Sequence, residues 1–241
     1  MKNKKIIFEA AEEHSELLLN APTPATNNVP KWFKDQKFFS NGKADILEAE
    51  KMGDNAYTYK LCVPITDTIT SGYTVVIPAD IFVENIGTNN KYIPNIKWMV
   101  NFPVVDVQSA KSLANYPVPT GFNSIFFRWI HDWQIKTPQG YSSFFMHPIH
   151  RHDLPFFTIS GIVDTDTFPN KLHLPFFIKN GFEGIIKEGT PIAQFLPFKR
   201  DNWKSEKKPF SKKSNIIYNN IMKLNYIRTY KNKFWSKKVY R

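Results

Sequence analysis

The sequence has little of the cysteine that disulfide-rich folds and many zinc-stabilised folds require. Cys62 is the single cysteine among 241 residues, which excludes an internal disulfide framework and any zinc site with several cysteine ligands. Because Cys62 lies in an apolar run, we expect it to be a buried small hydrophobic residue. No run of 18 or more apolar residues occurs, so the sequence predicts no membrane span. The N-terminal residues lack a signal-peptide core, which predicts a cytoplasmic protein.

Acidic residues are scarce in one region, the C-terminal end. The whole chain has 32 Lys+Arg and 21 Asp+Glu, a formal net charge of +11. Residues 199–241 contain 14 basic and 2 acidic residues, a net charge of +12, which leaves residues 1–198 with a net charge of −1. The basic character therefore belongs to the C-terminal segment, and attraction to acidic partners or nucleic acid concerns that segment alone.

Short β-branched and aromatic runs, separated by Pro, Gly, Asn and Asp, dominate residues 56–198. With 42% hydrophobic residues and 21 Phe, the chain can build a substantial core. Runs of this length and spacing are typical of an all-β sandwich or jelly roll. The runs are YTYKLCVPI, SGYTVVIPADIFV, NIKWMVNFPVVDV, NSIFFRWIHDWQIKTP, YSSFFMHPI, LPFFTISGIVD, KLHLPFFI and EGIIKEGTPIAQFLPF.

The chain divides into three parts by composition. Residues 1–55 form an N-terminal extension and linker, with KKIIFEA as an edge strand and 37–55 as loop or mixed structure. Residues 56–198 form the β domain, in which we expect the prolines to lie at strand ends. Residues 199–241 form a basic, aromatic tail. Apolar spacing in that tail predicts a helix over about 215–231 with Ser214 as its N-cap.

Four motifs in the β domain carry a resemblance to a known family. They read PVPTGF, GYSS, GIVDTDTF and GTPIAQFL, at 117–122, 140–143, 161–168 and 189–196. In order and spacing they resemble the dUTPase and dCTP-deaminase superfamily, which are β-clip jelly rolls. The resemblance implies a catalytic or water-activating role for Asp164. It also implies ligand contacts by Ser142, Ser143, Asp166 and Gln194, with Mg²⁺ as cofactor if the chain acts on nucleotides.

The departures from that family concern its phosphate site. Tyr141 stands where the family has an arginine before the serines, and a phenol lacks the permanent charge and bidentate donors of a guanidinium. The segment beginning at Ser71 reads SGYT where the family has A-G-Y-D. Phe168, after the Asp164 turn, comes one residue late and has no hydroxyl. The glycine-rich C-terminal arm that closes over nucleotide is replaced by the basic tail.

The whole chain also resembles an uncharacterised family of proteins from tailed phages and some bacteria. The shared text reads PKWFK, CVPITDTITSGY and HPIHRHDLPF, at 30–34, 62–73 and 147–156. This resemblance implies no established activity. It implies a phage-encoded protein located in the host cytoplasm or the virion.

Each candidate residue also has a plain structural interpretation. Asp164 is either a base or ribose contact, or the first residue of an Asx-type turn that accepts backbone N–H groups. His150 and His152 would chelate a metal if they projected from one strand face, with His173 as a third ligand, or they are ordinary turn residues. The tail aromatics would stack on bases, or dock on protein.

Three hypotheses follow from these alternatives. The first, which we favour, is a non-catalytic β-clip module, a phage structural or accessory protein that associates with itself or another protein through its basic tail. Nucleic acid is the alternative partner of residues 199–241. The second is a dUTPase-type nucleotide hydrolase using Asp164, in which Arg128, Arg151 or a tail lysine from another subunit replaces the missing arginine. The third is a metal-dependent jelly-roll enzyme using His150 and His152.

Overall fold

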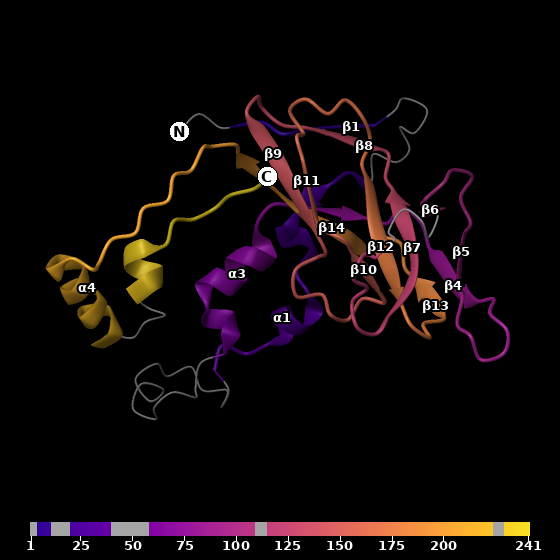
Figure 1. The fold of residues 1–241 in the computed structure, drawn as a ribbon, viewed down its shortest axis with the longest axis horizontal. Coiled ribbons are helices and arrows are strands. Elements are labelled where there is room, and N and C mark those ends of the chain that lie inside the picture. Colours follow the sequence, from indigo (N-terminus) through magenta and orange to yellow (C-terminus); the bar gives the residue numbers. More distant parts are fainter. Residues whose placement is uncertain (1–3, 11–19, 40–57, 109–114, 224–228) are drawn as a thin grey trace. The chain divides into compact units, whose positions relative to one another are not determined.

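The computed structural model describes residues 4–10, 20–39, 58–108, 115–223 and 229–241. The chain is mainly β, and the strands pair antiparallel (Figure 1). The strands are β1 (Ile7–Ala10), β2 (Thr23–Pro24), β3 (Tyr73–Val76), β4 (Ile81–Asn85), β5 (Pro94–Trp98), β6 (Val105–Val107), β7 (Phe122–Ile130), β8 (Trp133–Lys136), β9 (Tyr141–Met146), β10 (Phe156–Thr158), β11 (Gly161–Val163), β12 (His173–Lys179), β13 (Gly184–Ile186) and β14 (Pro191–Lys199).

The chain forms two compact units, each built from separate stretches of sequence. The β unit contains residues 1–28 and 72–200, and the helical unit contains residues 29–71 and 201–241. The helices are η2 (Ala25–Asn28), α1 (Lys31–Asp35), η3 (Tyr59–Leu61), α3 (Val63–Thr70), α4 (Lys212–Lys223) and η5 (Tyr230–Phe234). Among the described residues, no helix combines the length and the apolar character needed to cross a membrane.

Within the described residues the β unit contains two larger sheets with a shared core. Their strand orders are β11-β9-β14-β3-β2 and β10-β12-β7-β6. Thr158 connects them, because its buried hydroxyl accepts from Trp129 Nε1 at 3.1 Å and donates to the Ile192 carbonyl of β14 at 2.6 Å. Smaller pairings, β1 with β8 and β13-β4-β5, complete the strand set. The KKIIFEA segment is therefore a strand at a sheet edge, as predicted.

Aromatic side chains fill this core, as the high phenylalanine content predicts. Trp129 of β7 stacks on Phe176 of β12 with ring centroids 3.6 Å apart, and Phe145 of β9 stacks on Phe195 of β14 at 4.9 Å. All four side chains are fully buried. Burial of large apolar surface of this kind is the main favourable term in folding.

The run YTYKLCVPI is helical, and its prediction as a strand is wrong. It forms η3 and the start of α3, with Pro64 in the first turn of the helix, where a missing backbone N–H costs nothing. Thr66 and Thr70 donate their hydroxyls to the carbonyls four residues earlier, at 3.3 and 2.8 Å, so both hydroxyls are satisfied within the helix. Cys62 is half-buried at the N-cap of α3, and not fully buried as expected.

The C-terminal segment contains a helix in the predicted region, and this helix begins earlier than predicted. α4 begins at Lys212, and Ser211 is its cap, because Ser211 Oγ accepts the Ser214 N–H at 3.1 Å. Ser214, the predicted cap, lies inside the helix. Residues 224–228 of the predicted helix, and residues 40–55 of the predicted loop, lie outside the described residues.

Within the helical unit, the end of the C-terminal segment is attached to α3. Trp235 Nε1 donates to Asp67 Oδ2 at 2.9 Å, and Lys238 Nζ contacts the same oxygen at 2.6 Å. The domain boundaries therefore differ from those expected. Residues 56–71 belong with the C-terminal segment in the helical unit, whereas residues 1–28 belong to the β unit.

Candidate functional site

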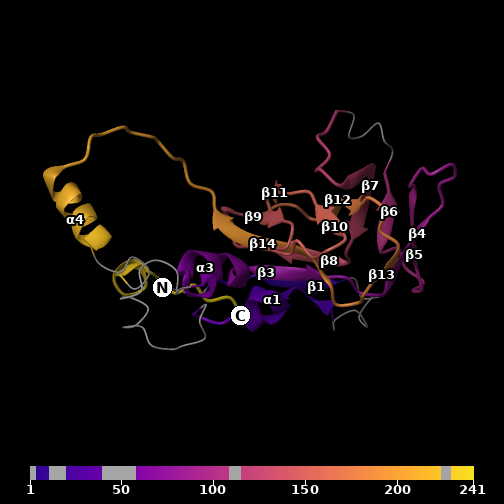
Figure 2. The same cartoon turned by 90° about the horizontal axis from the view of Figure 1, so that it is seen from below.

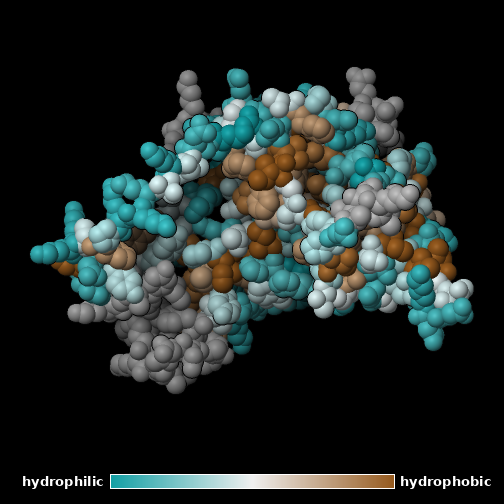
Figure 3. All heavy atoms as spheres, in the orientation of Figure 1, coloured by the Kyte–Doolittle hydropathy of each residue, from teal (hydrophilic) through white to brown (hydrophobic). Residues whose placement is uncertain are grey.

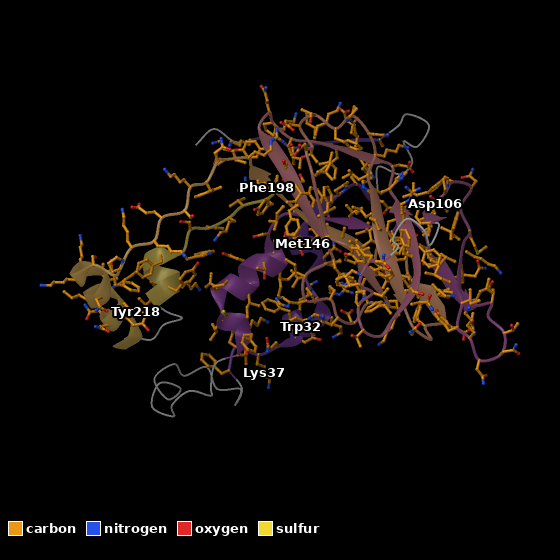
Figure 4. All side chains as sticks on the ribbon, in the orientation of Figure 1. Trp32, Lys37, Asp106, Met146, Phe198 and Tyr218 are labelled. Atoms are coloured by element: carbon orange, nitrogen blue, oxygen red, sulfur yellow. The ribbon has the colours of Figure 1, made fainter. Side chains whose placement is uncertain are left out.

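Strand pairing brings three of the four motifs together. β9 begins with the GYSS motif and lies between β11 and β14 (Figures 1 and 2). In register, Ser143 pairs with Val163 of the GIVDTDTF motif, and Ser142 pairs with Phe198 of β14. Phe198, labelled in Figure 4, marks the end of β14 at which the polar side chains of these segments meet.

Four of these side chains form one hydrogen-bonded group, which we call the Arg200 cluster: Ser142, Asp164, Asp166 and Arg200. Ser142 Oγ donates to Asp164 Oδ1 at 2.6 Å. Arg200 Nη1 donates to Ser142 Oγ at 3.0 Å and lies 3.2 Å from Asp164 Oδ1. The serine hydroxyl therefore bridges the guanidinium and the first carboxylate of the motif.

Asp166 is the principal partner of the guanidinium. Its two carboxylate oxygens accept from Arg200 Nη1, at 2.8 Å, and from Nη2, in a bidentate ion pair. The Gly140 N–H donates to Asp166 Oδ2 at 2.7 Å. Together, the Arg200 hydrogen bonds and the Gly140 N–H lower the pKa of Asp166 to about 2. Asp166 is therefore ionised at every physiological pH.

The two carboxylates differ in their exposure. The Asp166 side chain is 1% exposed, whereas that of Asp164 is 60% exposed. The Asp164 carbonyl accepts the N–H groups of Thr167 and Phe168, at 3.1 and 2.9 Å, which closes the turn after β11. Asp164 thus combines the predicted turn position with an accessible carboxylate, and Asp166 faces the protein.

Buried hydroxyls lie beneath the cluster. Ser143 Oγ is within 3.0 Å of Thr165 Oγ1, which is 2.8 Å from Thr137 Oγ1. Ser142 and Ser143 are both fully buried, so neither hydroxyl reaches a ligand unless the surrounding residues move. The two serines hold the strand and the turn together in this structure.

Gln194 and the histidine motif lie in another part of the β unit. Gln194 is buried, and its Oε1 accepts the Ile149 N–H at 3.2 Å, which supports the turn over residues 147–153. His147 stacks on Phe157 at 5.1 Å and accepts the Thr158 N–H through Nδ1 at 3.3 Å. Burial lowers the pKa of His147 below its ordinary value. Both residues therefore serve the packing of this turn.

His150 and His152 do not extend from a strand, contrary to the expectation. Both lie in turns, and His150 has a φ of 58°. Their ring centroids are 6.2 Å apart. His173 is in β12, where it pairs with Ile130 of β7. Within the described ranges, no three His, Cys, Asp or Glu side chains gather in a way that would hold a metal ion.

The cation beside the serines is Arg200, which the sequence reasoning did not identify. Arg128 is paired with Asp106, and Arg151 donates to Asp153 at 2.8 Å, so both predicted replacements are engaged elsewhere. No local pattern identified Arg200, because its position depends on the pairing of β14 with β9, which places the residue after β14 beside the start of β9. The Arg200 N–H does bond to the Gly140 carbonyl at 2.9 Å.

No protein-family model matches this chain, and the search of curated proteins likewise found no match.

Proposed function

We propose that this chain is a non-catalytic binding module: a β-clip domain of jelly-roll type that holds a macromolecular partner through its basic C-terminal segment. The setting implied by the phage resemblance is that of a structural or accessory protein, in the virion or the host cytoplasm. The observation that carries the proposal is the closed hydrogen bonding of the Arg200 cluster. Its charged groups bind one another and leave no guanidinium free for phosphate.

The net charge of the Arg200 cluster also disfavours the binding of a phosphate group. Asp164, Asp166 and Arg200 together carry a formal charge of −1. A triphosphate would have to displace Asp166 from a bidentate ion pair and then lie beside two carboxylates. Oriented cationic groups are what phosphoryl transfer requires. The cluster is therefore suited to fixing the turn after β11 against β9 and β14.

The adjacency of the motifs supports the β-clip part of the proposal. GYSS and GIVDTDTF lie on paired strands, and IAQ lies in β14, on the other side of β9. Motifs that are far apart in the sequence thus converge on one sheet, with Gln194 opposite Met146 at the other end of β9 from Ser142. Convergence of this kind is what a shared fold with retained turns would produce.

The test is a nucleotide screen on the wild-type chain and on Asp164→Ala. Melting curves are recorded with each dNTP and with Mg²⁺, and hydrolysis is followed under the same conditions. A ligand at a hundred times its dissociation constant adds about 2.7 kcal/mol to stability, which a melting curve resolves. We expect no shift and no turnover. A nucleotide-specific shift that Asp164→Ala abolishes would overturn the proposal.

A second candidate is the dUTPase-type hydrolase, and one observation favours it. Arg200 supplies a guanidinium within 3.0 Å of Ser142 and 3.2 Å of Asp164, so the charge missing at Tyr141 returns from another strand. In this hypothesis Asp164 orients water, and Arg200 leaves Asp166 to contact phosphate. Arg200→Gln would then lower kcat/KM by at least about a hundredfold. Lys187→Gln, which alters an exposed ion pair with Asp80, is the matched control.

A further inference from the structure

The first part of the C-terminal segment is exposed, and its basic residues, one of which is Arg200 of the cluster, outnumber its acidic residues. We call residues 199–220 the arm. It contains seven basic and two acidic residues, a net charge of +5. Residues 201–211 have no helix or strand, and residues 199–213 are all exposed. In Figure 3 the region of α4 and the chain leading to it shows mainly teal, hydrophilic side chains with a few brown ones between them.

Large aromatic side chains alternate with the lysines of the arm. Trp203 is 91% exposed and Phe210 is 76% exposed. Tyr218, labelled on α4 in Figure 4, is 52% exposed. Lys204 and Lys207 lie between Trp203 and Phe210 in the sequence. Burying these rings would be favourable, so their exposure marks a surface that a partner covers.

The rest of the C-terminal segment provides a contrast within the same chain. It has a similar mixture of aromatic residues and lysines, yet Trp235 and Lys238 are bound to Asp67 of α3. Docking on protein therefore uses up the aromatic and cationic groups of residues 235–238. Trp203 and Phe210 remain largely exposed, and Phe210 lies against Tyr218 of the arm with ring centroids 6.4 Å apart.

Charge decides the class of that partner. The cores of protein interfaces are depleted of lysine, because each ammonium group must lose its water. Residues 1–198 have a net charge of only −1, so a second copy offers the arm little overall electrostatic attraction. A nucleic-acid strand can bind both kinds of side chain, because its phosphates attract the lysines and its base faces stack on the aromatic rings. Duplex DNA hides its base faces, whereas a single strand exposes them.

We propose that the arm binds single-stranded nucleic acid, with Trp203 and Phe210 stacked on bases and the lysines between and around them on the phosphates. This inference rests on the proposed function, since it names the partner of the basic segment. The extended chain between the two rings spans at most about 25 Å. Both rings would therefore contact one short stretch of the same strand.

The experiment uses the full chain and a fluorescently labelled dT oligonucleotide of about 20 nucleotides, with anisotropy measured over a range of NaCl concentrations. Affinity should fall linearly with salt on logarithmic axes, by about 0.7 in slope for each phosphate neutralised. Trp203→Ala should weaken binding by roughly five- to a hundredfold at unchanged slope. The double variant Lys204→Gln, Lys207→Gln should reduce the slope by about 1.4. Trp32→Ala, a partly exposed tryptophan of α1, is the matched control and should have no effect.

Several results would overturn the inference. One is the absence of binding at 50 mM salt, and another is equally tight binding of a duplex or of heparin with no effect of Trp203→Ala. Self-association that Trp203→Ala disrupts, without oligonucleotide binding, would make a second copy the partner. Binding to anionic vesicles alone would assign the arm to a membrane surface. Self-association leaves the proposed function intact, because the partner is still a macromolecule. Binding to vesicles alone would replace that partner with a membrane, and dNTP turnover would overturn the non-catalytic part of the proposed function by itself.

Discussion

Arg200 joins β14, β9 and the turn after β11. Its guanidinium contacts Asp164, Asp166, Ser142 and the Tyr141 carbonyl. Removing it leaves Asp166, with its 1% exposed side chain, ionised without its main partner. The cost of an unpaired charged group exceeds the benefit of most single hydrogen bonds. Arg200 is therefore a structural residue first.

We predict that Arg200→Gln lowers the midpoint of urea unfolding at pH 7. The pKa of Asp166 is about 2 in the folded chain, below its ordinary value of 3.8. Stabilisation by this pair is therefore present above about pH 4 and is lost as the pH falls toward 2. The difference between wild type and variant should narrow over that range. Lys187→Gln, with its exposed pair, should have little effect at any pH. An Arg200→Gln difference that does not change with pH would contradict this account.

His131 is a buried imidazole without a hydrogen-bond partner. It is 3% exposed, and neither ring nitrogen is bonded to any described residue. Burial is the main cause that lowers the pKa of His131 from 6.5 to about 4. The charges of His173 and Lys171 lower this pKa further, whereas the negative charge of Asp132 raises it. The neutral form is therefore the one that the folded chain accommodates.

We predict acid destabilisation that originates at His131. Between pH 6.5 and pH 4 the unfolded chain binds the proton and the folded chain does not, so stability falls as the pH falls. The loss amounts to about 3 kcal/mol at pH 4. His131→Leu should remove this loss and be at least as stable as wild type at pH 7. His131→Asn should be less stable at all pH values, without the loss. Unfolding midpoints from pH 7 to 4 decide the matter, and an unchanged pH dependence in both variants would refute it.

At the scale of elements, the contact between β3 and β14 depends on Gly72. Gly72 has a φ of +76°, and a Cβ at this position would lie 2.0 Å from the Phe195 carbonyl oxygen. Backbone atoms cannot move aside as a flexible side chain can. The Ser-Gly-Tyr segment thus has a packing role at the start of β3, although the Asp of the family's segment is absent.

We predict that Gly72→Ala destabilises the β unit by more than about 3 kcal/mol, because it adds a backbone clash to left-handed strain. Gly181→Ala is the matched control, with a φ of +73° and no atom within 4 Å of its added Cβ. Gly181→Ala should lower the free energy of unfolding only by the strain of a left-handed backbone, about 1–2 kcal/mol. Chemical denaturation of both variants gives the comparison. Equal losses would show that the approach to Phe195 is unimportant.

At the scale of the whole molecule, the chain leaves the helical unit and returns to it. Residues 29–71 precede most of the β unit and residues 201–241 follow it, yet they form one compact unit. Asp67 is the described anchor of that association, through Trp235 and Lys238. A discontinuous unit of this kind depends on both of its segments.

We predict that a chain ending at Arg200 keeps a folded β unit and loses order in residues 59–70. The sheets and the Arg200 cluster remain in the shortened chain, so the β signal in circular dichroism and cooperative melting should persist. Trypsin should cut at Lys60 faster than in the full chain. The full-length variant Asp67→Ala should show the same effect more weakly. Loss of the β signal on truncation would show that the units do not fold separately.

The local sequence determined most of the strands and the nature of the core. Alternating aromatic and β-branched residues ended by Pro, Gly and Asn specify strands whatever their partners, and the seven β runs after residue 70 form strands as predicted. The sequence also determines that the positive charge is concentrated in residues 199–241.

The tertiary structure alone decided which distant groups meet. Whether an arginine after β14 reaches Asp166 depends on the register between β14 and β9, which no single segment contains. The burial of His131 and the attachment of Trp235 to Asp67 likewise depend on segments far apart in the chain. Local patterns determine which face of a strand or helix is buried, because the spacing of apolar residues along the sequence matches the repeat of that element. Partners across a fold are set by packing, and packing places Arg200 in the cluster and leaves the arm exposed.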